Sequence, residues 1–88
     1  MTHARRVDAN HGSIVKALRK IGCHVFDSSK LGRGFPDLVV QFGFRMMLVE
    51  VKAPGGKLTP EQEEFHRIWA KHCVVAESPE DAIKQVTR

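Results

Sequence analysis

The sequence has few cysteines and no long apolar run, and both absences limit the classes of protein to which it can belong. Cys23 and Cys73 are its only cysteines, and they lack the close paired spacing of a zinc site. Because each lies among apolar residues, we expect two buried free thiols in a reducing compartment. No stretch approaches the roughly 20 apolar residues that a membrane span needs. A metal finger and a membrane protein are therefore both disfavoured.

The first residues also lack an apolar run. Residues 1–10 are polar and basic, unlike the apolar centre of a signal peptide. We therefore expect a soluble, cytoplasmic protein. Repeats and linkers are absent too, and a chain of 88 residues is long enough for one domain. The sequence predicts a flexible N-terminal arm over residues 1–7 and a single domain over residues 8–88.

The chain carries a modest positive charge, with 14 Lys and Arg against 10 Asp and Glu, or a net charge of +4. A solvated surface explains this charge, and so does attraction to a polyanion, whose phosphates release counterions when Lys or Arg neutralise them. Both interpretations stay open, but the sign favours nucleic acid over acidic substrates. A domain this small buries only about two-thirds of its unfolded surface, so we expect a homodimer.

Hydrophobic periodicity predicts a mixture of helices and strands. Ile14, Leu18 and Ile21 recur at helical spacing after a cap at Asp8 or Asn10. The elements that we expect are a helix over residues 9–21, strands over 23–27, 37–42 and 45–52, a helix over 60–71 with Phe65, Ile68 and Trp69 buried, a strand over 73–76 and a helix over 79–87. This α-β-β-β-α-β-α order predicts an α/β fold in which helices flank a small mixed β-sheet.

Three ionisable residues stand at special places in the predicted strands. Asp37 opens the second strand, and Glu50 and Lys52 share one face near the end of the third. A turn near Gly43 would pair these strands as a hairpin. Hairpin pairing brings the start of one strand beside the end of the next, so we expect Asp37 next to Glu50. Two carboxylates and one ammonium would then converge at one end of the sheet.

Such a cluster suits a hard divalent cation. Two close carboxylates repel each other, and a bound cation removes that conflict. Oxygen ligands from Asp37, Glu50 and the carbonyl of Val51 suit Mg²⁺ or Mn²⁺. The cation would activate a water and neutralise a phosphate oxygen, while Lys52 would orient that water or stabilise developing charge. We therefore predict a metal-dependent phosphodiester hydrolase.

A structural interpretation of the same residues is also open. Glu50 and Lys52 could form a surface ion pair of about 0.2–1 kcal/mol, and Asp37 could cap a strand. The conjunction favours chemistry, because ionisable residues in apolar strands are costly.

Three blocks follow one another along the chain: GFPDL at residues 34–38, LVEVKAPGG at 48–56 and LTPEQ at 58–62. Together they resemble the VRR-NUC family, a branch of the PD-(D/E)XK nucleases. The resemblance implies a restriction-endonuclease-like core, Mg²⁺ or Mn²⁺ dependence, metal ligands at Asp37 and Glu50, and a catalytic lysine at Lys52. Members of this size resemble phage and bacterial homodimers that cut branched DNA such as Holliday junctions.

The first helix departs from the family pattern. Family members often carry an acidic metal ligand there, whereas this chain has Asn10, His11 and Ser13, with Asp8 just before them. Three interpretations stay open: Asn10 is a neutral metal ligand, Asp8 reaches the metal instead, or Asn10 is a helix cap. The number of metals is open too. Gln62 either supports substrate or water, as in similar nucleases, or completes a capping box.

Three cations lie in the loops beside the predicted centre. Lys30, Arg33 and Lys57 would contact phosphates on either side of the cut, or they are solvated loop charges. No recognition helix is evident, which favours reading of DNA shape. We predict a structure-specific endonuclease that acts on branched DNA. The alternatives are a non-catalytic DNA-binding module on the same fold, and an interaction protein whose partner surface contains Phe42, Phe44, Phe65 and Trp69.

Overall fold

The computed structural model describes the backbone of residues 2–88 and the side chains of residues 10–88. The elements are α1 (Thr2–Lys20), β1 (His24–Asp27), β2 (Leu38–Phe42), β3 (Arg45–Val51), α2 (Pro60–Ile68), β4 (Cys73–Ala76) and α3 (Pro79–Thr87). The strands form one sheet in the order β1-β2-β3-β4, antiparallel except for the parallel pair β3 and β4. The prediction of a mixed sheet in an α-β-β-β-α-β-α fold is confirmed, and this arrangement is that of a restriction-endonuclease-like core.

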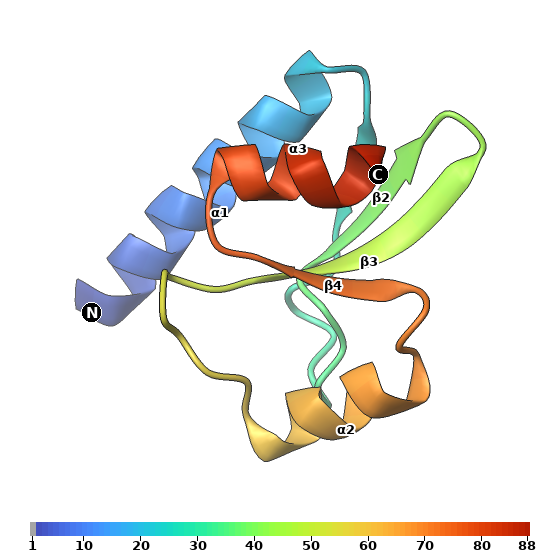
Figure 1. Ribbon diagram of the computed structural model, residues 1–88. Coiled ribbons are helices and arrows are strands. Elements are labelled where there is room, and N and C mark those ends of the chain that lie inside the picture. The colour runs from blue at the N-terminus through green and yellow to red at the C-terminus, as the bar shows by residue number, and fades with distance from the viewer. Residues whose placement is uncertain (1) are drawn as a thin grey trace.

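The two faces of the sheet are covered unequally. Helices α1 and α3 lie together over one face, and α2 lies alone on the other side (Figure 1). The core fills the first layer, and its fully buried members are Ile14, Leu18, Leu38, Val40, Val49, Ala76, Ala82 and Val86. Because side chains alternate along a strand, Val49 and Val51 join this core, whereas Glu50 points to the side of α2.

Helix α1 starts earlier than predicted. It begins at Thr2 and not near residue 9, because residues 2–8 contain neither glycine nor proline to interrupt it. Asn10 is thus inside the helix, and its role as a helix cap is wrong. The side chain of Asp8 lies outside the described residues, and independent motion of residues 1–7 stays a prediction.

Helix α2 is shorter and less buried than predicted. It ends at Ile68, none of its residues is buried, and Ile68 and Trp69 are 61% and 47% exposed. The half-buried stripe is formed by Gln62, Phe65 and His66 instead. The expected stripe is right to include Phe65 but wrong for Ile68 and Trp69, because the contact of Gln62 with the sheet fixes how the helix is turned about its axis.

The loop before β2 is anchored to the first turn of α2. Gly32, Arg33 and Gly34 all have positive φ, and a Cβ on Gly34 would lie 2.4 Å from the carbonyl oxygen of Glu61. Farther along α2, the rings of Phe35 and Phe65 meet edge to face, with their centroids 5.3 Å apart. The loop therefore sets the position of α2 against the sheet.

Both cysteines are buried free thiols, as predicted. Within residues 2–88, the helices are too short or too polar to span a bilayer.

We predict that Gly34→Ala destabilises the protein more than Gly55→Ala does. The two glycines have nearly the same φ, 77° and 78°, but a Cβ on Gly55 meets no atom within 4 Å. Gly55→Ala should therefore cost about 1 kcal/mol for the left-handed backbone alone, and Gly34→Ala a further ~1–3 kcal/mol for the clash. Urea unfolding measures both, and equal losses would show that the loop is not packed against α2 as described.

Candidate active site

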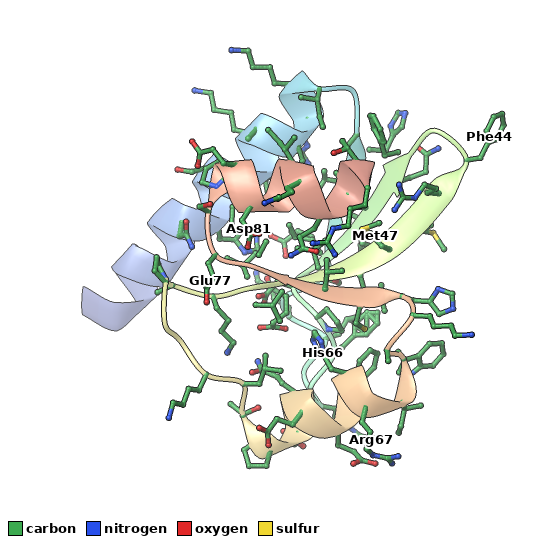
Figure 2. All side chains as sticks on the ribbon, in the orientation of Figure 1. Phe44, Met47, His66, Arg67, Glu77 and Asp81 are labelled. Carbon is green, nitrogen blue, oxygen red and sulfur yellow. The ribbon has the colours of Figure 1, made fainter. Side chains whose placement is uncertain are left out.

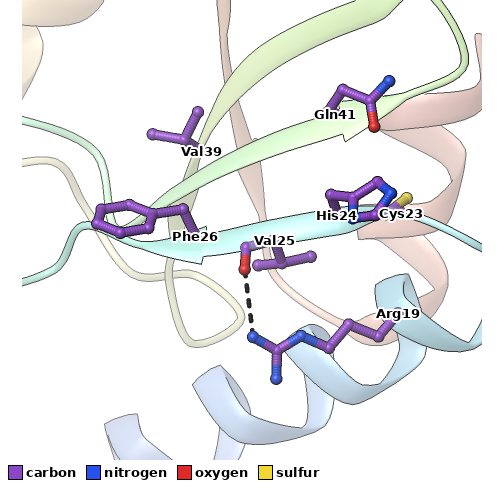
Figure 3. Close-up of a pocket in the computed structure, with 7 residues that line it drawn as sticks. All are labelled: Arg19, Cys23, His24, Val25, Phe26, Val39 and Gln41. Atoms are coloured by element: carbon purple, nitrogen blue, oxygen red, sulfur yellow. Dashed lines mark hydrogen bonds between the residues drawn. The ribbon is translucent and has the colours of Figure 1, made fainter.

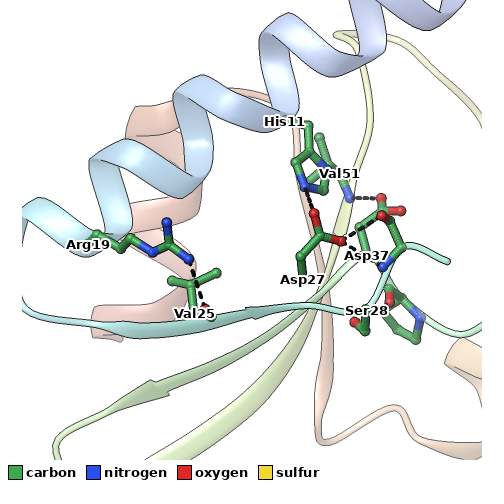
Figure 4. Close-up of polar contacts among 9 residues, drawn as sticks. His11, Arg19, Val25, Asp27, Ser28, Asp37 and Val51 are labelled. Carbon is green, nitrogen blue, oxygen red and sulfur yellow. Dashed lines mark hydrogen bonds and ion pairs between the residues drawn. The ribbon is translucent and has the colours of Figure 1, made fainter. Parts of the chain in front are cut away.

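The pairing of β2 with β3 places two carboxylates side by side. Leu38 pairs with Val49, so the next step of the same register sets Asp37 opposite Glu50. The Oδ2 atom of Asp37 accepts a hydrogen bond from the backbone N–H of Val51 at 2.9 Å, as Figure 4 shows. Asp37 therefore does cap the strand end, and this bond also holds its carboxylate beside that of Glu50.

Glu50 is a buried carboxylate. It is 2% exposed, and its Oε2 accepts a hydrogen bond from Gln62 Nε2 at 3.1 Å and lies 3.8 Å from Lys52 Nζ. Its Oε1 is buried and has no hydrogen-bond partner within the described residues. A surface ion pair between Glu50 and Lys52 is thus ruled out, because the acid is inside the protein.

The surroundings of Glu50 oppose its ionisation. They raise its pKa from 4.5 to about 8, first through burial and then through the negative charge of Asp37. The ammonium of Lys52 lowers the pKa but does not restore it. The metal-free site is therefore short of positive charge near neutral pH.

A small pocket is lined by most of the predicted site residues. It has a volume of about 250 Å³ and is lined by Asn10, Asp37, Glu50, Val51, Lys52, Ala53 and Gln62. Asn10 reaches it from α1, where its Nδ2 donates to the carbonyl of Lys52 at 3.0 Å and to that of Glu77 at 3.4 Å. Residues from α1, the β2–β3 pair and α2 thus meet at one point.

Gln62 completes the capping box, and its support of substrate or water stays a prediction. Its Oε1 accepts from the backbone N–H of Thr59 at 2.9 Å and its own N–H donates to the Thr59 hydroxyl, which completes a capping box. Its Nε2 remains free for Glu50. The cap therefore orients the amide that holds the buried carboxylate.

A larger pocket lies elsewhere and has no carboxylate in its lining. Its volume is about 560 Å³ and it lies along β1, where Figure 3 shows its lining of Arg19, Cys23, His24, Val25, Phe26, Val39 and Gln41. The guanidinium of Arg19 already donates to the carbonyl of Val25 at 3.2 Å. Size alone would therefore have pointed away from the two carboxylates.

One ion pair beside the pocket was missed. His11 Nε2 and Asp27 Oδ2 lie 3.1 Å apart, and Asp27 also accepts two hydrogen bonds from Ser29 (Figure 4). The two residues are far apart in sequence, so their spacing carried no signal. The carboxylate is already satisfied, and the described residues contain no group of three or more His, Cys, Asp or Glu that could hold a metal.

The three predicted DNA-contacting cations are not part of the pocket. Lys30, Arg33 and Lys57 are exposed, and none of them lines the pocket of Asp37 and Glu50. Arg33 instead shares a surface hollow with Glu61 and Glu64. Contact of these cations with phosphate stays a prediction.

The raised pKa of Glu50 predicts a pH-dependent stability of the metal-free protein. Between pH 4.5 and about 8 the native state holds a proton that the unfolded state releases. The contribution of Glu50 to the free energy of unfolding is therefore most favourable below this window and is lost as the pH rises through it. Glu50→Gln keeps the shape without the titration, so it should be increasingly more stable than wild type from pH 5 to 8.5.

Urea unfolding in EDTA across that range tests the difference between the two proteins. Glu80→Gln, at an exposed position on α3, is the matched control and should follow wild type. A constant difference between wild type and Glu50→Gln would contradict the raised pKa.

Comparison with known proteins places this geometry in a family. A family model described as VRR-NUC domain matches residues 2–81 of the chain. Neither the curated proteins nor the solved structures gave a match.

Proposed function

The chain belongs to the VRR-NUC domain family and so has a nuclease-type function in DNA processing, and from this premise we propose a metal-dependent, structure-specific DNA endonuclease that works as a homodimer. Its substrate would be branched DNA such as a Holliday junction, and its cation Mg²⁺ or Mn²⁺. Asp37, Glu50, Lys52 and Gln62 would form the catalytic group.

One observation carries this proposal: a buried carboxylate oxygen, Oε1 of Glu50, faces no partner within the described residues while Asp37 repels the same group. A buried charge without a partner is expensive. A hard cation supplies the missing charge and the missing contact together. The donors of the pocket are oxygens, without thiol or imidazole ligands, and such a set fits Mg²⁺ or Mn²⁺. Asp37, Glu50, the carbonyl of Val51 and the amide oxygen of Asn10 would hold the cation.

The residues around the cation would then have separate functions in cleavage. When bound, the cation supplies Lewis acidity and lowers the pKa of a water. Lys52 places a positive charge where negative charge develops on the phosphate. Gln62 keeps Glu50 in place through Oε2, and the backbone of Val51 does the same for Asp37. Lys30, Arg33 and Lys57 would position the DNA backbone from the flanking loops.

We expect purified protein to cut branched DNA only with Mg²⁺ or Mn²⁺, and EDTA to abolish cleavage. Asp37→Asn, Glu50→Gln and Lys52→Met should each lower the cleavage rate by about 100-fold or more, while Glu80→Gln should be unchanged. A gel panel of Holliday junction, flap, splayed arm, single strand and duplex measures rate and preference together.

The same panel separates the alternative function. A non-catalytic DNA-binding module would bind these DNAs with a steep salt dependence, leave them uncut with either metal, and bind as tightly after Glu50→Gln. Cleavage of linear duplex as fast as of junctions would contradict the preference for branched DNA.

The homodimer is supported by apolar surface on the side of the sheet where α2 lies. A hollow of about 430 Å³ is lined by Phe35, Met46, Met47, Leu48, Phe65, Trp69 and His72. Within it Met46 is 67% and Trp69 47% exposed. Phe44 is fully exposed and points away from the tip of the β2–β3 hairpin (Figure 2). Apolar surface of this kind marks a contact site, and a second copy of the chain would cover it.

We predict that wild type sediments as a dimer, and that Met46→Glu and Trp69→Glu sediment as monomers with unchanged circular dichroism. A carboxylate on this surface would be desolvated in the dimer but not in the monomer, and this cost would favour the monomer. Ser13→Glu adds the same charge on α1, at an exposed position in the other layer, and should remain dimeric. A wild-type protein that is monomeric at all concentrations would contradict the proposed dimer.

A further inference from the structure

His66 is a half-buried imidazole that the proposed chemistry does not use. It follows Gln62 by one turn on the same face of α2, and Figure 2 shows it projecting from that helix toward the sheet. Its Nε2 is shielded from solvent and has no hydrogen-bond partner within the described residues. Buried polar atoms are nearly always paired, so an unpaired one at the edge of a site calls for a function.

Lys52 is the charged group that acts on His66. Burial lowers the pKa of the imidazole, and the positive charge of Lys52 lowers it further. The lowered pKa favours the neutral imidazole near pH 7, and Nε2 accepts a hydrogen bond in the tautomer that has its proton on Nδ1. The side chain of Lys52 is only 17% exposed, and the ion-pair partner of its ammonium, Glu50 Oε2, lies 3.8 Å away. That distance exceeds an ordinary hydrogen bond, so the described contacts leave the ammonium loosely held.

We propose that His66 is a positioning residue for Lys52, and that its unpartnered Nε2 accepts a hydrogen bond from the Lys52 ammonium. The proposal rests on the nuclease function above. The ion pair of Lys52 with Glu50 would weaken once a cation neutralises that carboxylate. The hydrogen bond from Lys52 to the neutral imidazole of His66 would not weaken in this way. One face of α2 would then support both halves of the centre, because Gln62 holds Glu50 and His66 holds Lys52.

Two substitutions separate this function from simple packing. His66→Leu fills the space without an acceptor, and His66→Gln places an amide oxygen near the position of Nε2. We expect His66→Leu to lower kcat roughly 10–100-fold with little change in KM, as loss of a supporting partner does at other sites. His66→Gln should stay within a few-fold of wild type. His24→Leu, at an exposed position on β1, is the control and should not change kcat.

A second readout does not depend on cleavage. In ¹⁵N-lysine-labelled protein, a hydrogen-bonded ammonium exchanges its protons slowly and gives a distinct NMR signal, which Lys52→Arg assigns. We expect that signal in wild type and His66→Gln, and its loss in His66→Leu.

The two measurements distinguish failure of this inference from failure of the nuclease proposal. Suppose that wild type cuts no DNA, and that the Lys52 signal is present in wild type but absent in His66→Leu. The nuclease function then fails and the contact stands. If wild type cuts DNA and His66→Leu matches it, or if the Lys52 signal is the same in both proteins, the inference is overturned. An equal loss of kcat in His66→Gln and His66→Leu would also overturn it, because packing would then explain both.

Discussion

The register between β2 and β3 is the constraint on which the site depends. Because Leu38 pairs with Val49, Asp37 and Glu50 become neighbours at the strand end, and Asp37 Oδ2 receives the N–H of Val51. A slip by one residue would turn Glu50 into the core and Val49 away from it. The burial of Val49 and Val51 therefore enforces the position of the carboxylates, so that the hydrophobic core of the first layer also secures the polar site of the second.

The side chains of the candidate site also make structural contacts. Asp37 caps the sheet, Gln62 caps α2, and Asn10 ties α1 to the carbonyls of Lys52 and Glu77. Each contact joins two elements and at the same time orients a group toward Glu50 or its neighbours. Loss of any of these side chains would therefore affect stability as well as chemistry, which is why isosteric substitutions are the informative ones.

The two layers of the protein differ in packing, and the difference fits a division of tasks. The layer of α1 and α3 contains the buried core, whereas α2 has no buried residue and is held by its cap, by Gln62 and by the close approach of Gly34 to Glu61. The open layer contains the pocket around Glu50 and the exposed apolar residues Met46 and Trp69. The proposed ligand and partner surfaces thus lie together on the side of the sheet that has the fewer buried residues.

The sequence by itself determined the order of the elements, the buried cores of β2 and β3, and the meeting of Asp37 with Glu50. These features follow from local periodicity and from one short hairpin, so neighbouring residues carry all the information. It did not determine the start of α1, where a polar segment gives no periodic signal, or the inward face of α2, where several apolar residues compete. Only the tertiary structure showed that Glu50 is buried with a free oxygen, that Gln62 and Asn10 reach across from separate helices, and that His11 pairs with Asp27. Those contacts join residues distant in the chain, and their geometry depends on how the helices pack on the sheet, which spacing along the sequence does not encode.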